Sequence, residues 1–251
     1  MVLPSKDPTR RAKRNLLRIL RDAKSEVGSG KKYDKNFAII GCSIISGSGA
    51  SAPARHFTET FKAFMNQHAD FRTYVPLTNG WDQYRQGYAG RSLRQLVETE
   101  KVHEAVPKVP LVVIETCLHN DLGQNLTPAE RRGYLDFLAN YFQGRGSMTV
   151  FMSSNPRGYG TDPFVNGNGH TWMDLFEDEK AFCELKGYEY IDQYTPWESE
   201  RVRRGYDRTK MYLVVNGQPD LIHPDDEGYD IMATTLKRAI CGVEYGYGNP
   251  Y

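Results

Sequence analysis

The sequence predicts an α/β fold of three layers, a parallel sheet with helices packed on both of its faces. Short apolar runs alternate along the chain with segments in which apolar residues recur at helical spacing. The runs at 37–40 and 111–114 are continuously apolar, which is typical of strands that helices cover on both sides. No change of composition divides residues 37–241, and a length of 251 residues suits one large α/β domain. We therefore expect one such domain over residues 37–251, preceded by a separate arm.

Residues 1–36 form this predicted arm. They hold eleven Lys or Arg and four Asp or Glu, a net charge of about +7, whereas the whole chain carries +1. Apolar residues recur at helical spacing from Ala12 to Val27, which predicts a basic amphipathic helix before a short Gly-Ser-Gly linker. The helix packs on its own domain, or residues 1–30 dock on a protein partner or an anionic surface. Nucleic-acid binding is a less favoured third interpretation, because the overall charge is close to zero.

The expected elements of the domain follow in chain order. In the first half they are a strand at 37–40, a loop of small residues at 47–51, a helix from Pro53 to about His68, a possible strand at 73–77, a loop rich in Gly and Tyr at 78–90, a helix at 92–105 and a strand at 111–114. In the second half they are a helix from a Thr-Pro-Ala-Glu capping box at 127–130 to about 142, a strand at 148–152, a long loop at 155–170, a helix at 172–185, a strand at 188–191 and a helix from 225 or 226 to about 240. Residues 195–218 are ambiguous, a charged helical turn and then an apolar stretch that suits part of a lid, and the tail 242–251 is expected at the surface.

Several classes of protein are disfavoured by what the sequence lacks. Its four cysteines lie far apart with no CxxC spacing, so we interpret them as reduced thiols in a cytoplasmic product without a signal peptide. No apolar run is long enough to span a bilayer. There is no HExxH motif or Cys/His cluster, and no P-loop or GxGxxG pattern. The sequence therefore predicts no metal site and no cofactor.

Four polar segments follow the expected strands and should meet at one edge of the sheet, because ligand crevices lie at the carboxyl ends of parallel strands. They are Gly-Cys-Ser at 41–43, Gly-Tyr-Ala-Gly at 87–90, Leu-His-Asn-Asp at 118–121 and Asp-Leu-Ile-His-Pro at 220–224. Ser43 is a candidate nucleophile only if a base and oxyanion donors lie beside it.

This set of segments resembles the motifs of the SGNH hydrolases, also known as GDSL-type esterases and lipases. That family has a Gly-Asp-Ser block, a glycine block, a Gly-x-Asn-Asp block and an Asp-x-x-His block in the same order, and the likeness covers most of residues 37–241. The resemblance implies a flavodoxin-like α/β/α sheet and a serine esterase that works through an acyl-enzyme without a cofactor.

The resemblance also implies roles for individual residues. Ser43 would attack an ester carbonyl, His223 would act as base and then as acid, and Asp220 would orient the imidazole. The amides of Ser43 and Gly90 and the side chain of Asn120 would stabilise the oxyanion.

Two positions depart from the family pattern. Cys42 stands where the family has Asp, so we expect altered hydrogen bonding there. Leu118 stands where Gly is usual, and we expect it to narrow the pocket beside Asn120. His119 is then a polar neighbour of the oxyanion site and a candidate for substrate binding, as are Tyr88 and His170.

The loops predicted near this edge favour a short acyl group, for example acetyl on a carbohydrate, over a long-chain lipid. They are polar and rich in glycine, and their aromatic rings suit sugars, although such rings also occur as packed surface. These rings are Tyr84, Tyr88, Tyr159, Phe164 and Trp172. The other histidines, His56, His68 and His103, are expected on helices as surface or satisfied core residues.

Plainer interpretations stay open at this stage. The Asp220–His223 segment also reads as a helix-entry turn, and Asn120 with Asp121 as a simple turn pair. The alternative function is a catalytically degenerate binding or structural protein, carried on a larger assembly such as a virus particle through its basic arm.

Overall fold

The computed structural model describes residues 37–67, 83–158 and 164–241, and the account below concerns these residues. The arm at 1–36, the possible strand at 73–77, the tail at 242–251, His68 and Tyr159 lie outside them. The division between arm and domain therefore stays a prediction.

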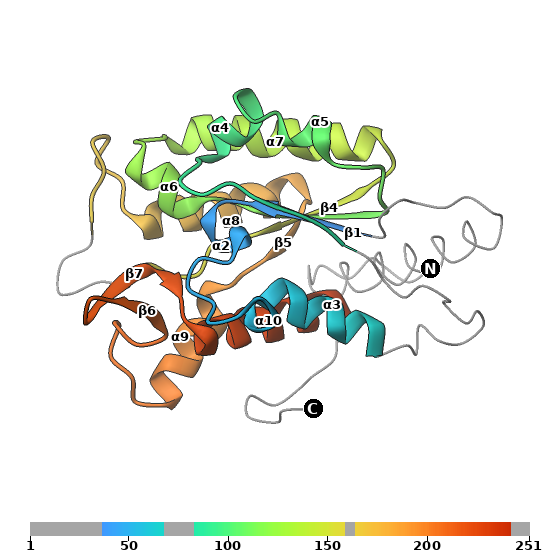
Figure 1. The fold of residues 1–251 in the computed structure, drawn as a ribbon. Helices are drawn as coiled ribbons and strands as arrows, with labels where there is room; N and C mark the ends of the chain where they lie inside the picture. The colour runs from blue at the N-terminus through green and yellow to red at the C-terminus, as the bar shows by residue number, and fades with distance from the viewer. Residues whose placement is uncertain (1–36, 68–82, 159–163, 242–251) are drawn as a thin grey trace, which may run out of the picture.

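A five-stranded parallel sheet forms the middle layer of the described part (Figure 1). Its strands are β1 (Phe37–Gly41), β2 (Gln83–Gly87), β3 (Leu111–Glu115), β4 (Met148–Met152) and β5 (Glu189–Ile191). They run in the order β2-β1-β3-β4-β5, and every neighbouring pair is parallel. All residues of β1 and β3 are buried, as the continuous apolar runs predict.

Helices cover both faces of this sheet (Figure 1). One layer consists of α4 (Leu93–Glu98), α5 (Val102–Ala105), α6 (Leu118–Gly123), α7 (Pro128–Gly144) and α8 (Trp172–Lys186). The other layer consists of α3 (Phe57–Gln67), α9 (Tyr194–Arg203) and α10 (Asp226–Cys241). The prediction of a three-layer α/β/α fold is therefore confirmed.

Short elements complete the described chain. They are the one-turn helix α2 (Ser43–Ser46), the 3₁₀ turn η1 (Pro53–Arg55), and the antiparallel hairpin of β6 (Tyr212–Val215) and β7 (Gln218–Pro224). The hairpin lies beside α9 and α10, away from the main sheet (Figure 1).

Two element predictions are wrong. Residues 83–87, expected in a loop, form edge strand β2, whose half-buried polar residues give no apolar run. The helix expected at 92–105 is interrupted at Lys101, which has φ +46°, so α4 and α5 are separate. Residues 212–224, of which the first part was ambiguous and interpreted as part of a lid, form the hairpin of β6 and β7.

Two of the aromatic residues expected in loops are not in loops. Trp172 is the first residue of α8 and is buried, and Tyr84 belongs to β2. Neither therefore lies in a flexible loop at the edge of a pocket.

The strand order places a topological switch between β1 and β3. The chain leaves β1 for β2 on one side and later returns to β3 on the other side. In open α/β sheets of this order, such a switch opens a crevice at the carboxyl ends of the two strands. The segments that follow β1 and β3 contain Ser43 and Asn120.

Candidate active site

Ser43 is the first residue of α2, two residues after the end of β1, and it is buried. Neighbouring elements hold this short helix in place. The Ile44 carbonyl accepts a hydrogen bond from the His56 ring at 2.7 Å, and the Tyr229 hydroxyl donates to the Ser48 carbonyl at 2.7 Å. Ser43 therefore lies on a turn that is held by His56, the residue before α3, and by Tyr229 of α10.

Asp220 and His223 come from β7 and contact one another across a single turn. His223 Nδ1 lies 3.0 Å from Asp220 Oδ2, and His223 Nε2 lies 2.9 Å from Ser43 Oγ. The other carboxylate oxygen, Oδ1, accepts the backbone N–H groups of Ile222 and His223, both at 3.1 Å. The structure thus joins a carboxylate, an imidazole and a hydroxyl in one chain of hydrogen bonds.

The carboxylate of Asp220 is held in its charged form. Burial raises its pKa, but hydrogen bonds from the His223 ring and from the backbone N–H groups of the turn outweigh burial, so the pKa lies below its usual value. A charged carboxylate at Nδ1 keeps the proton on that nitrogen and leaves Nε2 free to accept one from Ser43.

The turn between Asp220 and His223 is fastened to the loop after β4. Asn155 Nδ2 donates to the Ile222 carbonyl at 2.8 Å, and the Gly158 N–H donates to the Leu221 carbonyl at 2.8 Å. Leu221 has φ +64°, a conformation that costs a leucine roughly 1–2 kcal/mol. These two hydrogen bonds help to keep the strained turn in the shape that brings the histidine to the serine.

Hydrogen bonds join the segment after β2, which contains Gly90, to α6, which contains Asn120. Asn120 Nδ2 donates to the Arg91 carbonyl at 2.9 Å, and Gln124 Nε2 donates to the Gly90 carbonyl at 3.1 Å, so α6 fastens the Gly90 turn. Gly90 has φ +72°, which favours glycine, and a side chain there would project into open space. Because an amide nitrogen carries two hydrogens, Asn120 keeps one that the Arg91 carbonyl does not use.

His119 and Leu118 are more deeply buried than expected. Leu118 is fully buried in a cluster with Leu122 and Trp172, so it lines no open pocket, and that expectation is wrong. His119 is 4% exposed, and its ring lies 6.1 Å from the Trp172 ring. Burial first, and then the charges of Arg157 and His223, lower the pKa of His119 to about 3.

The remaining candidates for substrate contact differ in position. The Tyr88 N–H donates to the Gly41 carbonyl at 3.0 Å, so Tyr88 lies beside the end of β1. His170 lies just before α8, where its N–H donates to Asn166 Oδ1 at 3.0 Å, and no contact of the described part links it to Ser43. His56 and His103 are buried, and the ring of His56 is fully hydrogen-bonded, as expected for a satisfied core residue.

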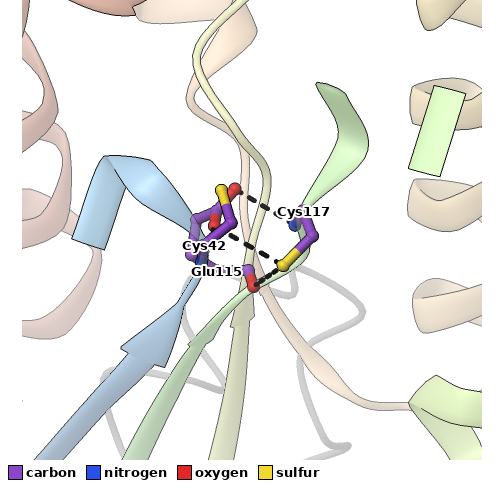
Figure 2. A group of neighbouring side chains, drawn as sticks. All are labelled: Cys42, Glu115 and Cys117. Atoms are coloured by element: carbon purple, nitrogen blue, oxygen red, sulfur yellow. Dashed lines mark hydrogen bonds between the residues drawn. The ribbon is translucent and has the colours of Figure 1, made fainter. Parts of the chain in front are cut away.

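Glu115, at the end of β3, is fully buried among the segments that carry the site. Its carboxylate accepts the Cys42 N–H at 3.0 Å, the Cys117 N–H at 3.1 Å and the Ser154 hydroxyl. Its carboxylate and the sulfurs of Cys42 and Cys117 lie within 4.8 Å of one another, as metal ligands would, and Figure 2 shows the three side chains facing each other. Cys42 Sγ also lies 4.0 Å from Ser43 Oγ, a weak contact at the position where the family has Asp.

Comparison with known proteins gives structural matches over most of the chain. The acetylxylan esterase Axe2 from Geobacillus stearothermophilus matches with a TM-score of 0.61 at 17% identity, over 86% of this chain and 98% of that one. A lipolytic protein of the G-D-S-L family from Veillonella parvula matches with a TM-score of 0.57 at 17% identity, over 80% and 96%. Another from Desulfitobacterium hafniense matches with a TM-score of 0.53 at 14% identity, over 82% and 99%.

The chain has the SGNH hydrolase fold. No protein-family model and no curated protein matches the sequence, so the likeness rests on structure alone. Within the part of the chain that the structure describes, none of the helices could span a membrane.

Sequence reasoning missed three residues at this edge of the SGNH fold: Glu115, Ser154 and Asn155. Glu115 could have been noticed, because it is a carboxylate directly after the strongest apolar run of the chain. Ser154 and Asn155 follow β4 at the same sheet edge, but serine and asparagine are so common in loops that nothing in the sequence marks them.

Proposed function

We propose that the protein is a serine esterase that hydrolyses a carboxylic ester through an acyl-enzyme. The observation that carries the proposal is the hydrogen-bonded chain from Asp220 through His223 to Ser43, at 3.0 Å and 2.9 Å. A nucleophile within hydrogen-bond reach of a base, with the base oriented by a third group, is the arrangement that activates a serine hydroxyl.

The proposed reaction has two halves. His223 Nε2 takes the hydroxyl proton of Ser43 as the oxygen attacks the ester carbonyl, and the tetrahedral intermediate then collapses as the imidazolium protonates the departing alcohol. A water molecule, activated by the same nitrogen, then attacks the acyl-serine and releases the acid. Asp220 stabilises the imidazolium throughout and fixes its tautomer.

In this proposal the oxyanion is stabilised by three donors. They are the backbone amides of Ser43 and Gly90 and the second amide hydrogen of Asn120. One such donor typically contributes about 3–4 kcal/mol to transition-state stabilisation.

We propose a short acyl group, such as acetyl on a carbohydrate, as the substrate. Support comes from the structural matches to Axe2, which is described as an acetyl-xylooligosaccharide esterase and an acetylxylan esterase. They include catalytic mutants of Axe2 in which a serine or an aspartate is replaced by alanine. We propose Tyr88 as a contact of the substrate because it adjoins the end of β1, and His119 because it lies near His223. His170 is retained as a weaker candidate from its place in the loop before α8.

The test is hydrolysis of p-nitrophenyl acetate by wild type, Ser43→Ala, His223→Ala and Ser48→Ala. We expect kcat of Ser43→Ala and of His223→Ala to fall about 10⁴-fold or more below that of wild type. Ser48→Ala removes a nearby hydroxyl outside the hydrogen-bonded chain and should keep full activity. Equal rates in all four proteins would rule out the mechanism, and a higher kcat/KM for the octanoate ester would rule out the short-acyl preference.

A second candidate is a binding protein with a degenerate site, carried on a larger assembly through residues 1–30. One observation favours it: Cys42, at the position where the SGNH motif has Asp, lies with its sulfur 4.0 Å from the Ser43 hydroxyl. A fluorophosphonate probe that fails to label Ser43 in the folded protein would support this candidate over the esterase.

A further inference from the structure

Glu115 connects three segments that are distant in sequence and that all end at the site. Its two carboxylate oxygens accept hydrogen bonds from Cys42 after β1, from Cys117 after β3 and from Ser154 after β4. The side chain is fully buried, so no solvent shares these hydrogen bonds. A Cβ at Gly41 would lie 2.7 Å from both Glu115 Cβ and Oε2, so only glycine lets the carboxylate lie this close to β1.

The first connection fixes the backbone that precedes the nucleophile. The Cys42 N–H donates to Glu115 at 3.0 Å, while the Cys42 carbonyl accepts the N–H groups of Ile45 at 3.1 Å and Ser46 at 3.2 Å. The N–H and the carbonyl of Cys42 are therefore both hydrogen-bonded, and the peptide group between Cys42 and Ser43 cannot rotate freely. The direction of the Ser43 N–H and the start of its side chain follow from this peptide.

The second connection fixes the start of α6. Cys117 has φ +56°, a left-handed conformation that costs a cysteine roughly 1–2 kcal/mol, and its N–H donates to Glu115 Oε1 at 3.1 Å. Ser154, which donates to the same oxygen, accepts the Leu118 N–H at 3.1 Å. The helix that carries Asn120 therefore begins at a point set by Glu115.

We propose that Glu115 is a positioning residue. It holds the turn of residues 42–46 that carries Ser43 (the nucleophile turn) at a fixed distance from the side chain of Asn120, the proposed oxyanion donor. The proposal rests on the esterase function proposed above. Misplacing a reacting group by about 1 Å can cost on the order of 100-fold in rate, so a residue that never contacts substrate can control kcat.

Cys42, Glu115 and Cys117 also resemble a site for a soft metal ion, because their two sulfurs and carboxylate lie within 4.8 Å of one another (Figure 2). The surrounding donors argue against it. N–H groups and a hydroxyl already point at the carboxylate oxygens, and their positive ends repel a cation. Burial raises the pKa of the Cys117 thiol well above its usual value, and the pKa of Cys42 is raised as well, so a metal ion would have to displace a proton from each sulfur.

The test compares Glu115→Gln with Glu179→Gln in the full-length protein. Glutamine keeps the size of the side chain but has one acceptor oxygen, so its NH₂ group must face the N–H of Cys42 or Cys117. Glu179 is an equally buried carboxylate that bonds Thr116, Arg131 and Tyr190 and does not touch the nucleophile turn. We expect Glu115→Gln to lower kcat about 10- to 100-fold with little change in KM, and Glu179→Gln to lower the melting temperature without lowering kcat at a temperature where it is folded.

Hydrogen–deuterium exchange of the same variants supplies a readout that needs no activity. We expect Glu115→Gln to speed exchange in peptides over 42–46 and 117–123, and Glu179→Gln to leave 42–46 unchanged. If wild type hydrolyses no ester but the exchange result holds, the esterase proposal fails and the positioning role stands. Unchanged exchange, an equal loss of kcat in both variants, or one equivalent of zinc that is bound by wild type and lost in Cys117→Ser would overturn the positioning role.

Discussion

The amide of Asn120 shows how much a single side chain can decide at this site. One of its hydrogens bonds the Arg91 carbonyl at 2.9 Å and thereby fixes the direction of the other. The side chain is therefore oriented before any substrate arrives, which is the condition for strong oxyanion stabilisation.

Replacing Asn120 with alanine should lower kcat for p-nitrophenyl acetate about 10²- to 10³-fold and leave KM nearly unchanged, because the lost hydrogen bond forms only in the transition state. Asn168→Ala, which removes an exposed amide that bonds the Asn125 carbonyl, is the control and should behave as wild type. A change in KM alone would mean that Asn120 binds the ground state and not the oxyanion.

His56 gives a prediction about pH. Its Nε2 donates to the Ile44 carbonyl and its Nδ1 accepts from Thr58 Oγ1, both at 2.7 Å, so the neutral ring is fully satisfied. Burial first, with a contribution from the charge of Arg85, lowers the pKa of His56 to about 4. Between that value and the unfolded pKa of about 6.5, the unfolded chain binds a proton that the folded chain refuses, so stability falls as the pH falls.

Urea unfolding at several pH values measures this effect. His56 should contribute a loss of up to about 1.4 kcal/mol in the free energy of unfolding for each pH unit from about 6 down to about 4. His56→Gln should show a shallower slope than wild type in that window and the same slope above pH 7. Parallel curves for the two proteins would show that the ring is not held neutral.

At the scale of elements, the helix α7 is the one whose start the sequence specified most fully. Thr127 Oγ1 accepts the Glu130 N–H at 3.3 Å, and the Glu130 carboxylate accepts the Thr127 N–H at 2.8 Å, as the capping box predicts. The hydrogen bonds from Thr127 lower the pKa of Glu130, in keeping with a charged carboxylate at a helix start.

Thr127→Ala should therefore reduce the free energy of unfolding by about 1 kcal/mol, and Thr127→Ser should restore most of it because the hydroxyl returns. Neither variant should change kcat, since α7 starts away from the hydrogen-bonded chain of Ser43. Thermal and urea unfolding measure the first effect, and a fall in kcat of Thr127→Ala would contradict the second.

Elements with a strong local signal were predictable from the sequence, and those set by distant contacts were not. The buried strands β1, β3 and β4 carry continuous apolar runs, whereas β2 reads Gln-Tyr-Arg-Gln-Gly and becomes a strand only because β1 offers it an open edge. The hairpin of β6 and β7 does carry a local signal, because Asn216 and Gly217 suit a tight turn, but residues 211–215 were interpreted as part of a lid.

The site shows the same division between local and distant information. Ser43, Asp220 and His223 could be chosen because each stands in a short motif, and the structure brings these three together. Glu115 was overlooked because its partners come from three loops whose meeting no local pattern reveals.

At the scale of the whole molecule, a buried network of ion pairs joins α6, the helix that carries Asn120, to the long helices α7 and α8. Arg131 of α7 is almost fully buried and bonds both Asp121 of α6 and Glu179 of α8. Asp121 also accepts the Leu93 N–H at 2.7 Å, so the network reaches the start of α4. Burial raises the pKa of Glu179 in spite of the nearby arginine, which indicates a large free-energy cost of removing these charged groups from water.

Arg131→Met should therefore destabilise the protein by about 3–5 kcal/mol, because it leaves two buried carboxylates without a cation. The neighbouring Arg132 is a matched control, since it bonds Asp178 at the surface and Arg132→Met should cost less than about 1 kcal/mol. Urea unfolding of the two variants makes the comparison. Similar losses in both would mean that the buried network adds no more than a surface ion pair.

The hydrogen bond between Ser43 and His223 joins residues 180 positions apart, and all five strands of the sheet are made before the histidine is. A ribosome translating this chain thus releases the proposed nucleophile long before its base, so a half-synthesised polypeptide holds an unreactive hydroxyl. Labelling of nascent chains by a fluorophosphonate should then begin only after β7 has been made, and chains that terminate before β7 should not be labelled.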